Sequence, residues 1–215
     1  MDLVNEVFTD TDGAAINPST WTAAAGGSTT ISIISNAWKV NCGAVASQFG
    51  NAWLLRREVR GDMDIYIDFI IPNPIAGLSR QSVYWHSNNV SPLNAYSLLV
   101  RHETGTYELG YYTNDVFTNM STTLASGLAA GDTIHFRIQH RGSNVKLKKW
   151  HNAAVEPATW TLDMTAAVSV GQFPYGIFSL ELYNNTAAAC SGSFDNIIVT
   201  TPNNPVPVTS TYYRR

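Results

Sequence analysis

The sequence predicts an all-β protein, a two-sheet antiparallel β-sandwich. Apolar and polar residues alternate in many segments, the period of a strand that buries one face, and no segment has a convincing helical period. The chain also opens and closes with matching segments, Phe8–Gly13 and Gly192–Val199. We therefore expect the first strand to pair with the last and close the sandwich.

Composition is consistent with one large domain, which we place at residues 1–200. The chain has 215 residues, of which 45% are hydrophobic, enough for a core between two sheets. Charged residues make up only 13%, and the formal net charge is −3. Because no basic field would attract a phosphate backbone, we expect no nucleic-acid partner.

Membrane insertion and secretion through a cleaved signal are not expected from the sequence. No apolar run approaches the roughly 20 residues of a membrane-spanning helix. The first six residues have neither the basic nor the apolar region of a signal peptide.

Several strands can be placed by their pattern. The clearest alternation sets the apolar residues 63, 65, 67 and 69 against Asp62, Asp64 and Asp68, and prolines end this strand at Pro72. Residues 132–140 and 144–150, separated by an Arg-Gly-Ser turn, predict a hairpin. The other expected strands are 29–34, 37–42, 53–59, 82–86, 95–101, 107–112, 176–183 and 192–199.

The two cysteines, Cys42 and Cys190, lie far apart in the sequence. We interpret them as two small buried residues. A disulfide is possible if their strands lie close together, which the sequence does not establish.

The segment 201–215 differs from the rest and is predicted to form an extended, proline-rich C-terminal arm. One interpretation is a frayed terminus. The other is an assembly arm that docks on a neighbouring subunit, with tyrosine and arginine as anchors. The residues of this arm are Pro202, Pro205, Pro207, Tyr212, Tyr213 and Arg214.

Four motifs together carry a family resemblance over residues 5–200. They are the opening Phe-x-Asp-x-Asp-Gly followed by Trp21, the tripeptide 149–151, Glu156-Pro157-x-x-Trp160, and the closing Gly-x-Phe-Asp-Asn-Ile-x-Val. In this order they resemble the concanavalin A-like jelly-roll domains of the laminin G, lectin and glucanase type. The resemblance implies bacterial extracellular proteins or bacteriophage virion modules, but this fold serves lectins, glycosidases and scaffolds alike.

The acidic strand tests the glycosidase alternative. Asp62, Asp64 and Asp68 are similar to the acidic strand of the laminarinase-type glucanases, but every position is Asp where that pattern has Glu. Residues four apart on a strand are about 13 Å from each other, whereas a retaining glycosidase needs carboxyl groups about 5–5.5 Å apart. We interpret the three aspartates as a solvated edge and expect no enzyme activity.

A structural calcium ion is the one cofactor that the resemblance implies. Its ligands would be Asp10, Asp12 and Asp195, where the first and last strands meet, and carboxylate oxygen suits calcium. The same aspartates are also typical of an ordinary turn, in which their side chains accept bonds from backbone amides. We favour the turn.

A sugar site would need aromatic faces beside polar groups. The candidates are Trp85, His86, Tyr111 and Trp150. The alternative is that these large aromatic residues pack in the core or on a sheet face.

The leading hypothesis is a non-enzymatic bacteriophage virion protein, a capsid decoration or tail-associated module that contacts other virion proteins and itself. Its location would then be the virion. The alternative is an extracellular lectin-like module that binds surface glycans, and a glycoside hydrolase is a distant third.

Overall fold

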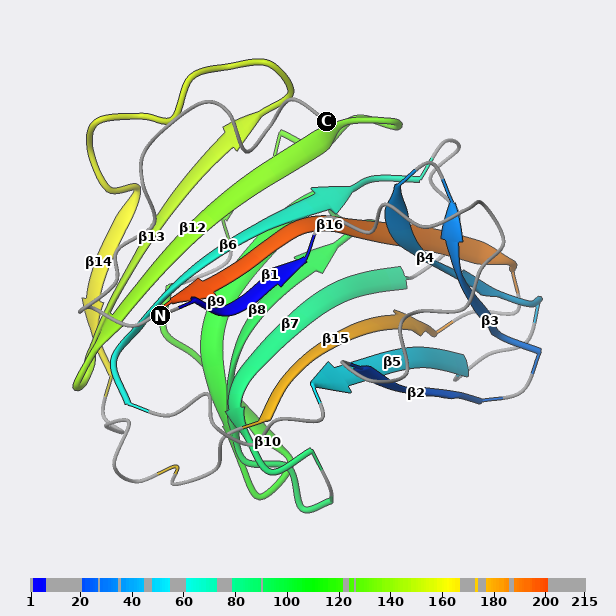
Figure 1. Ribbon diagram of the computed structural model, residues 1–215, viewed down its shortest axis with the longest axis horizontal. Coiled ribbons are helices and arrows are strands. Elements are labelled where there is room, and N and C mark those ends of the chain that lie inside the picture. The colour runs from blue at the N-terminus through cyan, green and yellow to red at the C-terminus, as the bar shows by residue number, and fades with distance from the viewer. Residues whose placement is uncertain are drawn as a thin grey trace.

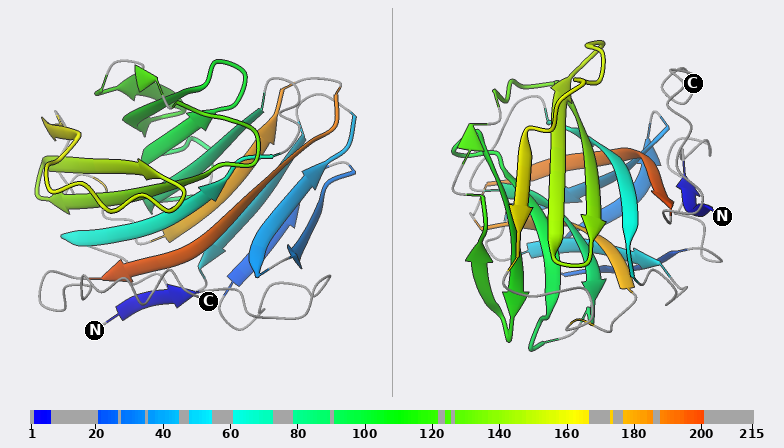
Figure 2. Two further views of the ribbon diagram at one scale, coloured as in Figure 1. Left: turned by 90° about the horizontal axis from the view of Figure 1, so that it is seen from above. Right: turned by 90° about the vertical axis from the view of Figure 1, so that its left-hand side faces the viewer.

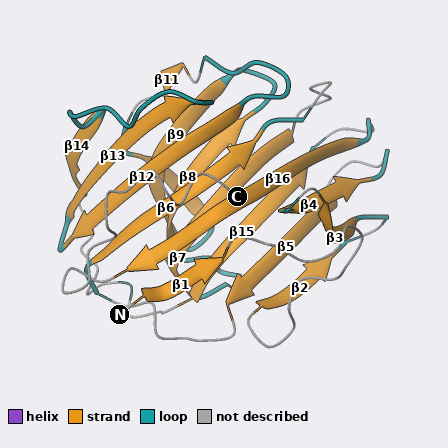
Figure 3. Ribbon diagram, turned by 45° about the horizontal axis from the view of Figure 1, so that its top comes forward, coloured by secondary structure: helices purple, strands orange, loops and turns teal. Residues whose placement is uncertain are grey.

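Strands are the only regular secondary structure in the part of the chain that a computed structural model of the protein describes (Figure 3). It describes residues 2–6, 21–26, 28–34, 36–44, 48–54, 61–72, 79–89, 91–121, 124–125, 127–166, 173, 177–185 and 188–200. No helix is present in these ranges, so none of them holds a helix that could cross a membrane. The strands are β1 (Asp2–Glu6), β2 (Trp21–Ala25), β3 (Thr30–Ile34), β4 (Ala37–Cys42), β5 (Gln48–Leu54), β6 (Met63–Ile70), β7 (Ser79–Ser87), β8 (Ala95–Arg101), β9 (Thr106–Thr113), β10 (Val116–Asn119), β11 (Leu124–Ala125), β12 (Thr133–Arg141), β13 (Asn144–His151), β14 (Leu162–Thr165), β15 (Ile177–Asn184) and β16 (Cys190–Thr200).

The strands form two antiparallel sheets that face each other, which confirms the predicted sandwich (Figures 1 and 2). Sheet A has the order β14-β13-β12-β6-β16-β4-β3, with β1 also paired to β16. Sheet B has the order β10-β9-β8-β7-β15-β5-β2, with β11 also paired to β9. The first strand pairs with the last, as expected, since Val4 lies opposite Val199. The pairing runs through residues 2–6, and the opening segment Phe8–Gly13 lies outside the described residues.

The core lies between the sheets and is built from alternate residues of the central strands. Phe69 of β6 contacts Phe136 and Phe194 edge to face, with ring centroids 5.3 and 5.0 Å apart. Val83, Leu98 and Leu180 cover the opposite side from sheet B. Burial of such residues is the main favourable term in folding.

Two glycines lie where the neighbouring side chains leave no room for a side chain at the glycine position itself. A Cβ at Gly50 would overlap the side chain of Val40 in the opposite sheet, and a Cβ at Gly192 would meet Gln81. Gln81 also donates a hydrogen bond from Nε2 to the carbonyl oxygen of Ser193, 2.7 Å away, which ties β7 to β16 across the core.

The predicted hairpin of β12 and β13 is present, and the expected strands 29–34 and 37–42 form another. β3 and β4 pair around Asn36, whose positive φ of 61° suits the left-handed conformation that asparagine tolerates. β12 and β13 pair from Ile134 and His151 to Arg141 and Asn144, and Gly142 supplies the positive φ of their turn.

Candidate functional site

The predicted sugar-binding residues of β7 and β9 lie in the interior. Trp85 is fully buried, stacks on Tyr96 with ring centroids 5.8 Å apart, and donates a hydrogen bond from Nε1 to Nδ1 of His140 at 3.0 Å. Tyr111 contacts Tyr96 from the next strand. His86 is buried and faces the ring of His140. These three residues therefore pack the core and present no open face on which a sugar could stack.

Trp150 lies elsewhere, on the outer face of sheet A. It is almost buried and stacks on His135 with ring centroids 5.3 Å apart. The structure therefore does not bring the four predicted residues together, and the expected stacking platform does not form from them.

The acidic strand is not a solvated edge, which corrects that expectation. Asp64 and Asp68 point to the outer face of sheet A, yet each is only 3% exposed. Asp64 pairs with Arg141 at 2.6 Å, and Asp62 accepts a bond from the backbone amide of Gly142. Each carboxylate thus has a structural partner.

Asp68 has two hydrogen-bonding partners on this face. It accepts from Asn196 Nδ2 at 2.6 Å and lies 2.6 Å from Nδ1 of His135. Burial alone would lower the pKa of His135, but the hydrogen bond and charge of Asp68 raise it above its ordinary value. The Asp68 carboxylate therefore favours the imidazolium form of His135.

The Glu156-Pro157-x-x-Trp160 motif completes the outer face of sheet A. Glu156 pairs with Arg137 at 3.0 Å and with Lys148 at 2.9 Å. The ring of Trp160 lies near both cations, 5.6 Å from the guanidinium carbon and 5.0 Å from Nζ. The motif fixes the segment after β13 against the sheet, so we assign it a structural role.

The outer face of sheet B carries a second polar cluster, which we name the Arg80 cluster: Arg80, Tyr84, Glu181 and Tyr183. Arg80 lies 3.5 Å from Glu181, and its guanidinium carbon lies 4.7 Å from the centre of the Tyr183 ring. The Tyr84 hydroxyl donates to Glu181 at 2.9 Å. Burial and the negative charge of Glu181 raise the pKa of Tyr84, so this hydroxyl stays protonated and remains a donor.

The register explains how this cluster forms. Arg80 of β7 lies opposite Tyr183 of β15 and Arg101 of β8. Arg101 in turn pairs with Glu108 of β9 at 3.0 Å. The Arg80 and Glu181 side chains are 27% and 16% exposed, so solvent reaches the cluster.

Several polar atoms beside the cluster have no hydrogen-bond partner in the described part of the chain. They are Nε of Arg80 and the hydroxyl oxygens of Ser97 and Ser179, both of which lie opposite Tyr84 in neighbouring strands. Buried polar atoms are nearly always satisfied by protein or by ordered water. Ser97 and Ser179 are fully buried, so a ligand on this face would meet the partly exposed Arg80 and Glu181 and not these two hydroxyl groups.

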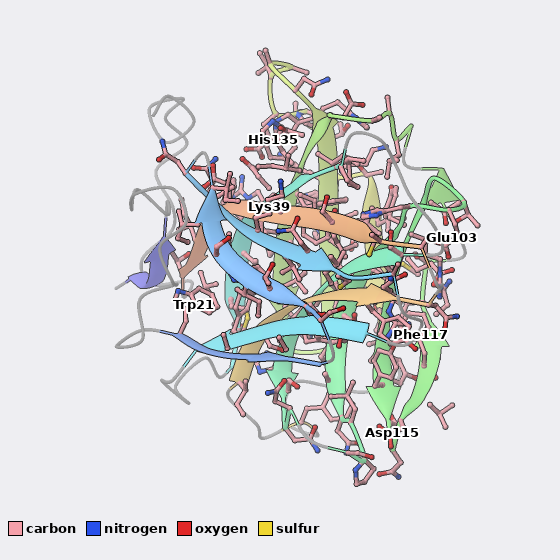
Figure 4. All side chains as sticks on the ribbon, turned by 90° about the vertical axis from the view of Figure 1, so that its right-hand side faces the viewer. Trp21, Lys39, Glu103, Asp115, Phe117 and His135 are labelled. Carbon is pink, nitrogen blue, oxygen red and sulfur yellow. The ribbon has the colours of Figure 1, made fainter. Side chains whose placement is uncertain are left out.

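An aromatic wall borders the cluster on the side of β9 and β10. The ring centroid of Tyr112 lies 6.0 Å from that of Tyr84 and 5.0 Å from that of Phe117. Gly110 makes this possible, because a Cβ there would come within 2.7 Å of the Phe117 ring. Figure 4 shows Phe117 and Asp115 toward one end of the molecule and His135 of sheet A toward the other.

The loops next to this wall are cross-linked by Asp115. Its carboxylate accepts from the hydroxyl of Ser91 at 2.8 Å and from the amide of Leu93 at 2.7 Å. Asn88 similarly accepts from the amide of Asn94. These bonds fix the β7–β8 loop against the β9–β10 turn.

The described residues include one of the three predicted calcium ligands and none of the C-terminal arm. Asp10, Asp12 and every arm residue lie outside them. Asp195 is described. It lies within β16, where the register with β6 shifts, and its carboxylate accepts from the backbone amide of Asn196 at 2.7 Å. The described ranges contain no group of three His, Cys, Asp or Glu side chains that could hold a metal ion. Calcium binding stays a prediction.

The residues of the Arg80 cluster were missed in the sequence. Glu181 and Tyr183 alternate with Leu180 and Leu182 in β15, which marks them as outward-facing. Nothing in the sequence shows that β15 and β7 are neighbours, because a long stretch of chain separates them. Only the pairing of strands brings Arg80 to Glu181.

Comparisons with known proteins identify the fold. No protein-family model matches the chain, and no curated protein matches it. Among solved structures, it is similar to carbohydrate-binding module CBM66 from Bacillus subtilis (TM-score 0.61, 12% identity, 85% of this chain and 96% of that one). It is also similar to the exoplasmic/lumenal domain of VIP36 in its Ca²⁺/Man3GlcNAc-bound form (0.63, 10%, 95% and 92%). A third is the lectin UEA-II complexed with galactose (0.62, 10%, 93% and 99%). At these identities the likeness establishes the lectin-like jelly-roll sandwich and no more.

Proposed function

We propose that this protein is a non-enzymatic carbohydrate-binding module, and that it takes its glycan on the outer face of sheet B at the Arg80 cluster. The observation that carries the proposal is the partly exposed pair of Arg80 and Glu181 with the Tyr183 ring beside it, a donor, an acceptor and an aromatic surface gathered in one place. The lectin-like neighbours, two of which hold mannose-containing or galactose ligands, support this choice of ligand class.

The chemistry of the cluster suits sugar hydroxyl groups. Each hydroxyl both donates and accepts, and adjacent hydroxyls on a ring present two such groups side by side. The guanidinium of Arg80 supplies donors and the carboxylate of Glu181 supplies acceptors. The half-buried Tyr183 ring adds apolar contact area next to them.

The charges of the region favour a neutral glycan. Arg80 is neutralised by Glu181, and Arg101 lies beside both Glu103 and Glu108. Three carboxylates against two guanidinium groups leave no surplus positive charge for a sulfate or carboxylate on the ligand. We therefore expect uncharged sugars to bind more tightly than sialylated or sulfated ones.

The virion role remains a prediction. It rests on the family resemblance, the low charge, the single sandwich without a convincing active site and the C-terminal arm, and the residues of that arm lie outside those the structure describes. The proposed glycan site, by contrast, stands on contacts between described residues.

The test is a glycan array probed with the purified chain, followed by calorimetric titration of the best neutral ligand. Changing Glu181→Gln keeps the size of the side chain but removes its charge and one acceptor. We expect at least a tenfold loss of affinity, about 1.4 kcal/mol. Tyr183→Ala should also weaken binding, because the glycan loses its contact with the tyrosine ring.

The matched control is Asp163→Asn, which removes a carboxylate from an exposed ion pair with Lys146 on sheet A. Its affinity should equal that of the unchanged protein. The proposal fails if no neutral glycan binds, or if Glu181→Gln binds as tightly as the control. Thermal melts of each variant show that a lost affinity does not reflect lost folding.

A further inference from the structure

The two cysteines face each other directly in sheet A. Cys42 is the last residue of β4, Cys190 is the first residue of β16, and the two are register partners. Residues directly opposite in an antiparallel pair have Cα atoms about 4.5–5.5 Å apart, within the range that a disulfide spans. Both thiols are buried and unbonded to any other sulfur.

We propose that Cys42 and Cys190 are a modification site. A small-molecule disulfide oxidises the two thiols there to a cross-strand disulfide, which links β4 covalently to β16. The inference is independent of the glycan site, which lies on the outer face of the other sheet.

The backbone on both sides of the pair is already held in position. Asn184 of β15 donates from Nδ2 to the carbonyl oxygen of Ala188 at 2.8 Å and to that of Gly43 at 3.3 Å. Gly43 follows Cys42 directly, and Ala188 precedes Cys190 by two residues. One side chain from sheet B thus fixes the chain next to each cysteine, so bond formation needs little backbone movement.

The thiols also interact with each other. The Cys190 thiol donates a hydrogen bond to the sulfur of Cys42, which lowers the pKa of Cys42 to about 7, while the same bond raises the pKa of Cys190. Cys42 is therefore the more acidic thiol of the pair and the one that attacks first, because the thiolate is the attacking form. The pair lies at the ends of its two strands, where local opening exposes it most readily.

The reaction with oxidised glutathione balances in two exchanges. The Cys42 thiolate attacks one sulfur of glutathione disulfide and releases one glutathione thiolate. The Cys190 thiolate then attacks the Cys42 sulfur and releases the second glutathione. Two electrons pass to glutathione, and the two protons of the cysteines end on the two glutathione thiols.

The test treats the reduced full-length chain with oxidised glutathione, quenches with acid and measures the intact mass. We expect the loss of two hydrogen atoms and a proteolytic peptide pair joined through Cys42 and Cys190. Because the bond closes a long loop of the unfolded chain, the thermal midpoint should rise by about 5 °C or more. Dithiothreitol should reverse both changes.

Two single variants serve as controls. Cys42→Ser and Cys190→Ser should each take up one glutathione and show no rise in thermal midpoint. The unchanged chain unfolded in urea confirms that the oxidant is active. An unchanged mass for the folded protein, a stable adduct with two glutathione groups, or a lowered thermal midpoint would each overturn the proposal. None of these results depends on whether a glycan binds.

Discussion

At the scale of single residues, the bond from Trp85 to His140 joins the two sheets through the core. Trp85 belongs to β7 of sheet B and His140 to β12 of sheet A. Burial lowers the pKa of His140 to about 3, with a further contribution from His86, so its ring is neutral and Nδ1 can accept the indole proton. A buried acceptor without its donor carries the full cost of desolvation.

Trp85→Phe tests this role directly. The ring of Phe keeps most of the apolar contact with Tyr96 but removes the N–H group. We expect a loss of about 1–3 kcal/mol in the free energy of unfolding, because Nδ1 of His140 is then unpaired. Urea unfolding followed by circular dichroism measures it. A change below about 0.5 kcal/mol, the usual range for an inconsequential surface substitution, would contradict this account.

At the scale of elements, the β12–β13 hairpin and strand β7 show what a sequence pattern can and cannot predict. The β12–β13 hairpin was predictable, because a Gly turn separates two alternating segments. The role of aromatic residues in β7 was not. Tyr84 and Trp85 are adjacent in sequence and point to opposite faces, and both faces of this strand are buried. Alternation alone does not predict which of these two residues points into the core.

The acidic strand β6 shows the same difficulty. Asp64 and Asp68 were correctly placed on the face opposite Ile65 and Ile67. The mistake lay in taking that face to be solvated, since Arg141 and His135 come to it from β12. Such partners arise from strand pairing over long separations in sequence, which composition and period do not reveal.

The close approach of β5 and β4 at Gly50 can be tested by a pair of substitutions. Gly50→Ala places a methyl group against Val40 and should cost about 1–3 kcal/mol in unfolding free energy, as overpacking usually does. Val40→Ala removes the opposing methyl groups and leaves a cavity. The double variant should be more stable than the sum of the two single losses predicts. Strict additivity in urea unfolding would show that the two residues do not press on each other.

At the scale of the whole molecule, the two outer faces of the sandwich differ in how their charges are used. On sheet A, Glu156 pairs with Arg137 and Lys148 beside the ring of Trp160, while Nε of Arg137 and the hydroxyl of Thr200 have no hydrogen-bond partner in the described chain. On sheet B, Arg80 and Glu181 are paired but partly exposed, beside hydroxyl groups that lack partners in the described chain. We therefore propose the outer face of sheet B, and not that of sheet A, as the face that meets a ligand.

The stability of the whole molecule should fall in mild acid, because two buried histidines are neutral in the fold. Burial lowers the pKa of His102 to about 4 and that of His140 to about 3, whereas an unfolded chain has a value near 6.5. His102 is held between the Ser79 hydroxyl and the Gln81 amide, each at 2.8 Å. Below pH 6.5 the unfolded chain binds protons that the folded chain does not, so stability is lost as the pH falls.

The expected loss between pH 7 and pH 5 is on the order of 2 kcal/mol for each histidine. The His135–Asp68 pair acts with the opposite sign, since its raised pKa makes its contribution fall as the pH rises above 6.5. Urea midpoints at pH 7, 6 and 5 measure the slope above the range in which carboxylates titrate. His102→Gln removes one titrating group and should flatten that slope by about half. A midpoint that stays constant or rises on acidification would mean that the two histidines are not buried as neutral rings.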